Sequence, residues 1–454
     1  MPTLTTRQGW NFEWLAQPLR RGPYLAWGLG LAAIKYLVEF AIIWATSATS
    51  YLPQQFLLPL LSAKSSATAG CPTWVLGFIF FWSYPFLIAA LVLTAKRCID
   101  MGQSPWLSLL LLVPFLNLVF IAAFVVWPSA TATQLQPRGA IPVGRKATFV
   151  RWTKAILLSQ LAEASILIVS VLLLHEYGMA MFFATPLVMG VLSGYTVSRE
   201  RLSLSASLWT SLLSLLIGMG LVLVAGVEGA ICLAMAAPLL IATTLLGGWF
   251  GHVLAFSVHD KSYTSLAITL PLVLLADWTW DLRQPRQVLT EIEIDASPED
   301  VWQTVVAFPP LREKPGGLFR WGVAYPIQAR IDGSGVGAVR YCEFSTGAFV
   351  EPITVWNPPE RLAFDVTEQP DPMTELSPYR QIHPPHLEGF LRTERGEFRL
   401  VRLPDGRTRL EGRTWYSIDM HPVHYWQVWC DQIIHAIHQR VLQHIKVVAE
   451  HGVD

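Results

Sequence analysis

The stretch VLTEIEIDASPEDVWQTVVAF (288–308) decides the fold of the C-terminal part of the chain. Its first half, 288–296, alternates apolar and polar residues, which is the pattern of a half-buried β-strand. Its second half carries the start signals of a helix, with Ser297 as the N-cap, Pro298 at the first helical position and acidic residues in the first turn. The stretch therefore predicts a strand followed directly by a helix.

Further strand-like runs follow this helix and are separated by glycine- and proline-rich turns. They cover residues 325–331, 336–345, 348–356, 361–368, 396–403 and 407–418. A long helix is predicted over about 422–449, where apolar residues recur at three- or four-residue steps. We predict an α+β helix-grip domain over 287–454, in which a curved antiparallel sheet wraps the long C-terminal helix and leaves a space between them.

Several segments resemble the polyketide cyclase/START-like superfamily, also called SRPBCC. They are EIEIDASPEDVWQTVVAF (291–308), RIDGSGVGAVRYCEF (330–344), WNPPERLAFDV (356–366) and the long final helix. The resemblance implies a deep, mostly apolar cavity for a hydrophobic small molecule. Members of the superfamily include lipid carriers, hormone receptors, cyclases and oxygenase domains, so the fold alone does not define the chemistry.

The chain before this domain is much more apolar. The whole chain is 52% hydrophobic and 15% charged, whereas about 25% charged residues is usual for a soluble domain. A membrane-spanning helix needs about 20 apolar residues, and residues 1–280 contain eight candidate spans. These are about 23–45, 74–94, 106–127, 155–174, 178–197, 206–226, 229–249 and 264–280. We predict an all-α polytopic membrane region of about eight helices.

A basic segment rich in proline and glycine, 128–154, is a candidate linker between two membrane modules. The first module, 1–127, holds three apolar spans, and the second, 155–280, holds about five. Arg20 and Arg21 precede the first span and indicate a cytoplasmic N-terminus by the positive-inside rule. The side of the membrane on which the C-terminal domain lies stays open at this point.

The segment KRCIDMGQSPW (96–106) resembles a motif of a bacterial inner-membrane family of unknown function. The matching residues are Lys96, Arg97, Asp100, Gly102, Ser104 and Trp106, whereas Ile99 and Pro105 depart from the motif. The resemblance covers about 1–130 and implies a module of the inner membrane without a defined activity. Asp100 is placed to pair with Arg97 and to cap the turn that leads into Trp106.

Charged residues inside apolar spans are costly and are therefore functional candidates. Lys35 and Glu39 are four residues apart in the first span, so they share one helix face. They form either a structural ion pair or part of a substrate or ion path. Glu163 is the single carboxylate of the fourth span, and it is either hydrogen-bonded near the interface or functional.

In the C-terminal domain the candidate ligand-binding residues are polar groups on strands and residues of the final helix. They are Arg340, Glu351, Glu411, Trp426, Ile433, Ile437 and His444. His444 falls within the apolar stripe of the helix and is a candidate for orienting a ligand. For the strand residues, an alternative is cross-strand pairing on the outer face of the sheet.

The segment QPDPMTELSPYRQIHPPHLEGF (369–390) is too rich in proline for regular structure. Loops of this length are usually functional or disordered, so we predict a lid over the cavity or a surface that faces the bilayer. Its candidate residues are Tyr379, His383 and His386. Histidines three residues apart can ligate zinc, but these lack an adjacent carboxylate and an HExxH motif, so no metal and no cofactor are predicted.

The leading functional hypothesis is a membrane-anchored domain that binds or transfers a lipid or isoprenoid-like molecule. The alternatives are a membrane-bound enzyme of the cyclase or hydrolase type, and a transporter or sensor. The expected partners are the lipid bilayer and a hydrophobic small molecule. No nucleic-acid partner is expected, because 33 basic and 33 acidic residues cancel.

Overall fold

The computed structural model describes most of the chain, and the description falls into two compact units. The described residues are 17–57, 67, 68, 70–103, 105–112, 116–130, 145–173, 177–199, 203–255, 285–311, 313–379 and 382–451. One unit comprises Met1–Val222 and Ala236–Asp281, and the other comprises Leu223–Met235 and Leu282–Asp454. The predicted span 264–280 and most of the predicted linker 128–154 lie outside the described residues.

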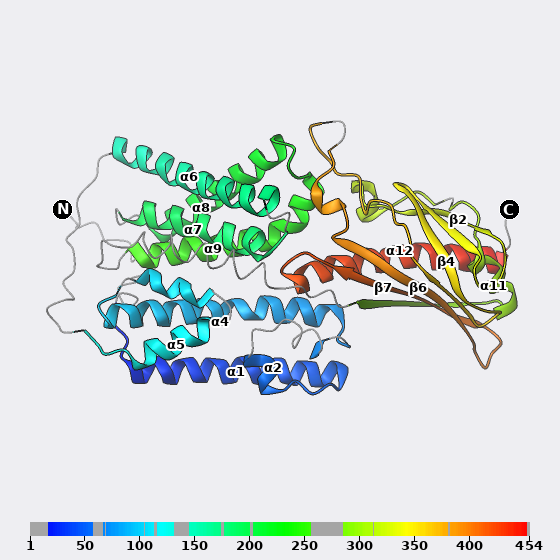
Figure 1. Cartoon of the computed structure of the whole chain (residues 1–454), viewed down its shortest axis with the longest axis horizontal. Helices are drawn as coiled ribbons and strands as arrows, with labels where there is room; N and C mark the ends of the chain where they lie inside the picture. The colour runs from blue at the N-terminus through cyan, green and yellow to red at the C-terminus, as the bar shows by residue number, and fades with distance from the viewer. Residues whose placement is uncertain are drawn as a thin grey trace, which may run out of the picture. The chain divides into compact units, whose positions relative to one another are not determined.

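The first unit is built from helices, which Figure 1 draws in blue to green. Their bounds are α1 Arg21–Ser47, α2 Pro53–Leu57, α4 Thr73–Asp100, α5 Leu116–Val126, α6 Arg145–Leu167, α7 Thr185–Ser198, α8 Leu204–Val224 and α9 Ala230–Ala255. Six helices of the described chain are long and apolar enough to cross a membrane: 21–47, 73–100, 152–170, 180–198, 204–224 and 230–255. These helices confirm the predicted membrane region and agree with six of the eight candidate spans.

The predicted span 106–127 is not one helix. Residues Pro105–Leu112 form a 3₁₀ helix, and α5 begins only at Leu116. Pro114 stands between them in the sequence, and a proline removes a backbone donor that a continuous helix needs. Among the described residues, this segment supplies a short apolar helix, Asn117–Val126.

Large apolar side chains cover the outside of the long helices. Trp27, Leu37, Trp44, Leu161, Trp209 and Leu216 are each more than half exposed in the structure. A row of exposed leucine and tryptophan is unfavourable in water and favourable in lipid. The span 180–198, which includes α7, is the exception among the six, because 83% of it is buried.

Glycines bring α7 and α9 into close contact. A Cβ placed on Gly190 would lie 2.7 Å from the backbone nitrogen of Gly248, and one on Gly251 would lie 2.7 Å from that of Tyr195. Apolar side chains of both helices, including Val191 and Phe250, pack around this contact. Such small-residue interfaces allow helix backbones to approach each other in lipid, where burial of apolar surface gives no driving force.

The second unit contains a seven-stranded antiparallel sheet of order β1-β7-β6-β5-β4-β3-β2. The strands are β1 Arg286–Ile294, β2 Pro326–Asp332, β3 Val339–Phe344, β4 Gly347–Asn357, β5 Arg361–Asp365, β6 Leu391–Arg402 and β7 Thr408–Ile418. The helix α11, Pro298–Val306, follows β1, and its N-cap Ser297 accepts a hydrogen bond from the backbone of Asp300 at 3.3 Å. The predicted strand–helix opening is thereby confirmed.

The long helix α12, Val423–His451, runs along the sheet (Figure 1, red). Its residues Leu442 and Ile445 are buried against Val301 and Val305 of α11 and Leu410 of β7, in one apolar core. The amphipathic stripe of α12 supplies the side chains that fill this core. A curved antiparallel sheet that holds a long helix is the helix-grip arrangement, so the predicted fold class is confirmed.

Candidate ligand cavity and a buried histidine cluster

Two adjoining cavities of about 110 Å³ each lie between the sheet and α12. We call the first the arginine lobe, since Arg340 and Glu351 line it, and the second the histidine lobe, since His386 lines it. Both lobes are lined by Phe344, Phe349, Thr393, Ile434 and Ile437. The lobes are therefore two parts of one mostly apolar space.

Arg340 and Glu351 are paired directly across β3 and β4. They form an ion pair and are only 2% and 5% exposed. Arg340 also donates from Nε to the carbonyl of Val306 at 3.2 Å. Burial alone would lower the pKa of Arg340, but the carboxylate of Glu351 more than offsets it and raises that pKa. The wall of the arginine lobe thus carries a satisfied pair of charges.

Three phenyl rings surround the guanidinium of Arg340. Its central carbon lies 5.6, 5.3 and 5.7 Å from the ring centres of Phe308, Phe364 and Phe398. Cations at such distances from aromatic rings are attracted by the ring faces. The rings also keep water away from the pair, which strengthens its electrostatics.

His438 forms a neutral part of the wall of the arginine lobe. Its Nδ1 lies 3.0 Å from Oγ1 of Thr290, and its Nε2 lies 2.8 Å from Oγ1 of Thr414. Burial, with a smaller contribution from His435, lowers the pKa of His438 to about 3. The imidazole is therefore uncharged at neutral pH and has hydrogen-bond partners on both nitrogens.

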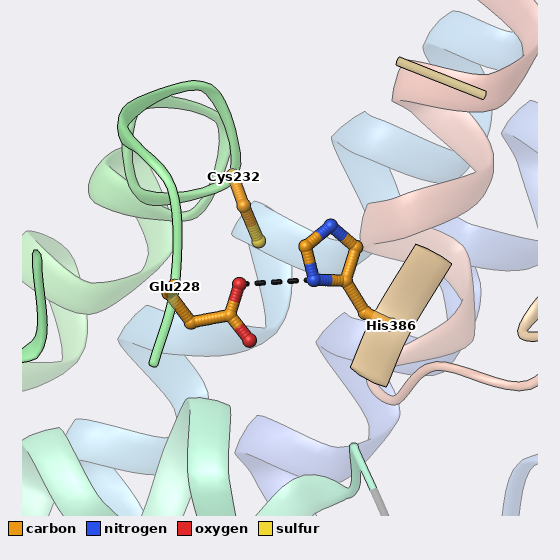
Figure 2. A group of neighbouring side chains, drawn as sticks. All are labelled: Glu228, Cys232 and His386. Carbon is orange, nitrogen blue, oxygen red and sulfur yellow. Dashed lines mark ion pairs between the residues drawn. The ribbon is translucent and has the colours of Figure 1, made fainter. Parts of the chain in front are cut away.

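A buried cluster of ionisable side chains borders the histidine lobe (Figure 2). Glu228, Cys232, Glu375 and His386 are 1%, 5%, 8% and 6% exposed. Oε2 of Glu228 lies 2.9 Å from Nδ1 of His386, and Oε1 of Glu375 lies 3.6 Å from Nε2 of the same ring. The imidazole thus lies between two buried carboxylates, one at each ring nitrogen.

Glu375 also caps the first turn of α9. Its carboxylate accepts hydrogen bonds from the backbone N–H groups of Ile231 and Cys232, each at 3.1 Å. A carboxylate at a helix N-terminus satisfies donors that have no partner within the helix and interacts favourably with the helix dipole. A Cβ on Gly229 would lie 2.6 Å from the Cβ of Glu375, so this approach requires glycine.

The pKa of His386 is strongly raised by its surroundings. Burial would lower its pKa, but hydrogen bonds and charge interactions with Glu228 and Glu375 raise it to about 9. In the absence of other cations the ring is therefore a buried imidazolium held by two carboxylates. Such a strongly perturbed group in a cavity wall marks a functional candidate.

The structure places most of the predicted ligand residues in this cavity. Arg340 and Glu351 line the arginine lobe, Trp426 and Ile433 line the histidine lobe, and Ile437 lines both. Of the three lid residues, His386 lines the histidine lobe.

The other two lid residues are more exposed. His383 is half exposed, and its ring nitrogens lie 3.6 Å from Asp371 and 3.1 Å from Glu388. Tyr379 donates its hydroxyl hydrogen to the carbonyl of Val224.

Among the described residues, Glu411 and His444 do not line either lobe. A Cβ at Gly412 would point toward Leu442 of α12, so its neighbour Glu411 faces the opposite side of the sheet. Glu411 there binds Arg413 at 2.7 Å and Arg409 at 3.4 Å. His444 donates from Nε2 to the carbonyl of Pro309 at 3.0 Å.

Among the described polar candidates of the helical unit, Lys35, Glu39 and Arg97 have polar partners within it. Lys35 and Glu39 form an ion pair, and Glu39 also accepts a hydrogen bond from Tyr51 at 3.3 Å. The carboxylate of Glu163 contacts the position of Gly218 on α8. Arg97 is fully buried, pairs with Asp100 and donates to the carbonyl of Phe124 at 2.8 Å.

Glu228, Cys232 and Glu375 of this cluster were not predicted from the sequence. Glu228 and Cys232 are four residues apart around the start of α9, whereas Glu375 and His386 lie more than 140 residues later. The four-residue spacing of Glu228 and Cys232, which is typical of two side chains on one face of a helix, was the one local pattern that could have indicated this cluster. Their convergence with His386 is a property of the tertiary structure.

Comparison with known proteins finds a family match in the N-terminal part of the chain. Residues 16–134 match a family described as a protein of unknown function, DUF805, which confirms the resemblance of the N-terminal part to a membrane family without a defined activity. No curated protein matches the chain.

Several solved structures are similar to the C-terminal domain. They include the Aha1 dimer from Colwellia psychrerythraea (18% identity, 37% of this chain and 98% of that chain, TM-score 0.22). A truncated norcoclaurine synthase from Thalictrum flavum matches at 14% identity over 38% of this chain and 98% of that chain, with TM-score 0.26. The di-domain ARO/CYC BexL matches at 14% identity over 42% of this chain and 57% of that chain, with TM-score 0.25.

Proposed function

We propose that this chain is a membrane-anchored protein whose helix-grip domain binds or transfers an apolar small molecule with a polar group, such as a lipid or an isoprenoid-like compound. The observation that carries the proposal is the two-lobed cavity between the sheet and α12. Apolar walls with a few fixed polar groups are typical of small-molecule sites. The paired Arg340 and Glu351 would hydrogen-bond the polar group, and the shared wall around Ile437 would contact the apolar part.

The size of the cavity sets the scale of the ligand. Each lobe of about 110 Å³ is somewhat smaller than the cavity of about 150 Å³ that holds benzene in an engineered protein. The two lobes together suit a ligand of one or two ring-sized apolar groups. A longer chain would need the loop 369–390, whose residues Gln369 and Met373 line the histidine lobe, to move outward as a lid.

The membrane anchor fits this proposal because apolar ligands partition into the bilayer. Tethering raises the effective concentration of the domain at the place where the ligand is found. We place the protein in the inner membrane of a bacterial cell, with a cytoplasmic N-terminus and the lipid bilayer as a partner.

Native mass spectrometry of the full-length protein, released from lipid nanodiscs, tests the proposal. The wild-type protein is expected to carry a bound small molecule. Ile437→Trp, which fills the wall shared by both lobes, is expected to lower its occupancy at least tenfold. Val447→Trp on the same helix is the matched control, because Val447 is 46% exposed. A wild-type protein without any adduct, or equal occupancy in both variants, would contradict the proposal.

The position of His386 favours a second candidate, an enzyme that acts on the same class of ligand. A histidine between two carboxylates can give and accept protons, and this one lines the cavity. If the domain is catalytic, His386→Ala will retain a molecule of different mass from the one bound by the wild type. Identical bound molecules would leave binding as the function.

A further inference from the structure

The cluster of Glu228, Cys232 and His386 has the composition of a transition-metal site. One carboxylate oxygen, one thiol sulfur and one imidazole nitrogen lie within 4.8 Å of one another. Figure 2 shows the carboxylate and the thiol both directed toward the imidazole ring. Imidazole and thiolate together favour a borderline-soft cation such as Zn²⁺ over Mg²⁺ or Ca²⁺.

We propose that Glu228, Cys232 and His386 bind a divalent transition metal, with Zn²⁺ as the expected ion. Zinc binds nitrogen and oxygen at about 2.0–2.1 Å and thiolate sulfur at about 2.3 Å, so tetrahedral neighbours lie about 3.3–3.7 Å apart. Oε2 of Glu228 and Nδ1 of His386 are 2.9 Å apart. The distance between these two atoms therefore has to grow by less than about 1 Å, and the thiol sulfur already lies within 4.8 Å of both atoms.

Glu375 has the position of an outer-shell partner. Its Oε1 faces Nε2 of His386 at 3.6 Å, whereas Nδ1 faces Glu228. In metal sites a ligating histidine usually donates its second N–H to a carboxylate, which sets the ring orientation. Glu375 also accepts the backbone N–H of Cys232 at 3.1 Å and so positions a second ligand.

A divalent ion can enter this cluster without adding net buried charge. Two carboxylates share a space in which every side chain is less than a tenth exposed, and buried negative charge requires a positive partner. Without a metal, the imidazolium of His386 is that partner. A divalent ion replaces two protons, since the thiol and the imidazolium release theirs to solvent as they become ligands, so the net charge of the cluster is unchanged.

The three ligands leave the fourth tetrahedral position for a further ligand. Cys232 and His386 both line the histidine lobe, so a metal between them borders this lobe. Its fourth position would be filled by water or by a polar group of a molecule in the lobe. Three protein ligands with one open position are typical of catalytic rather than structural zinc. The metal site does not depend on the proposed ligand, since its residues are complete without one.

Metal analysis of the full-length protein in detergent tests the site, with a purification tag that contains no histidine. After equilibration with Zn²⁺ and dialysis, elemental mass spectrometry is expected to find about one zinc per wild-type chain. His386→Ala and Cys232→Ser are expected to lower this content at least tenfold. His383→Ala, in the same loop and half exposed, is the matched control and is expected to keep the metal.

Replacement of zinc by Co²⁺ supplies a second, spectroscopic measurement that reports directly on the thiolate ligand. Co²⁺ bound to a thiolate gives a charge-transfer absorption, which the wild type and Cys430→Ser should show and Cys232→Ser should lack. Cys430 is a second buried cysteine of the same lobe. A folded wild-type protein that retains neither zinc nor the cobalt absorption overturns the proposal, as does undiminished metal content in His386→Ala.

Discussion

At the residue scale, the ionisable side chains Arg340 and His438 of the cavity wall are either paired with an opposite charge or uncharged. Arg340 is nearly fully buried, yet its guanidinium has Glu351, a backbone carbonyl and three phenyl rings as partners. His438 is a partly buried, neutral ring between two threonine hydroxyls. Because a buried unpaired charge is expensive, each partner contributes to the stability of the cavity wall.

Replacement of Arg340 should show this dependence. Arg340→Met leaves Glu351 without its cation, and the loss of one partner of a buried pair costs about 3–5 kcal/mol of stability. Arg340→Met combined with Glu351→Leu removes both charges and should recover a large part of the loss. The measurement is the thermal unfolding midpoint of the full-length protein in detergent, followed by tryptophan fluorescence. Equal midpoints for the single and double variants would refute the pairing.

His438 should make the domain less stable in mild acid. Its folded pKa of about 3 lies below the unfolded value of about 6.5, so only the unfolded chain binds a proton between these pH values. The contribution is complete above about pH 6.5 and falls by up to about 1.4 kcal/mol per pH unit as the pH drops toward 3. Unfolding midpoints between pH 7 and 4.5 should fall less steeply for His438→Gln than for His383→Gln. Parallel curves would rule out this role of His438.

At the element scale, helix contacts in the two units have different physical origins. In the helical unit, α7 and α9 approach through Gly190, Gly194 and Gly248, since small residues permit dense packing in lipid. In the other unit, α12 is held by burial of its apolar stripe against the sheet, which is favourable because water is excluded.

Substitution of Gly194 should therefore separate α7 from α9. A Cβ at Gly194 would lie 2.9 Å from the Cα of Gly248, and both atoms belong to helix backbones that cannot yield without moving apart. Gly194→Val should reduce the fraction of extracted protein that elutes as one symmetric peak in size-exclusion chromatography. Gly220→Val on α8 is the control, because no described heavy atom lies within 4 Å of a Cβ there. An unchanged profile for Gly194→Val would contradict this packing.

Elements were easier to predict than the site. The period-2 alternation of β1, the capping residues of α11 and the stripe of α12 are local patterns, and each element appears close to its predicted bounds. Strand β6 begins at Leu391 rather than at 396, because its first residues, LRTER, are too charged to be recognised as a strand. The site could not be predicted as well, because it depends on side-chain orientation and on contacts between distant segments. Glu411 faces away from α12, which the sequence does not show. Glu375 contacts the backbone of Cys232 only in the folded chain.

At the scale of the whole molecule, the chain consists of an apolar helical part and a C-terminal domain with a much higher share of charged residues. Six apolar helices belong to its first part, whereas the sheet and α12 form a domain with an ordinary share of charged residues. Hydropathy alone predicted this division, since it requires only composition and length. The run 106–127 was counted as one apolar span, whereas its described residues form a 3₁₀ helix and a separate short α-helix.

The helical part should keep the protein in isolated membranes when these are washed with salt or alkali. High salt and alkaline carbonate remove proteins held at membrane surfaces by charge, and the protein is expected to stay in the membrane pellet through both treatments. Detergent should release it, because detergent replaces lipid around the exposed leucine and tryptophan side chains. Recovery of the intact chain in the carbonate supernatant would argue against membrane-spanning helices.

The order of the elements has a consequence for biosynthesis. Strand β1 pairs with β7, which begins at Thr408, and α12 follows all the strands of the sheet. While a ribosome is still translating this region, β1 has no neighbour and the hollow side of the nascent sheet has no cover. A message truncated after β7 would yield seven strands with bare phenylalanines, which we expect quality-control proteases to degrade.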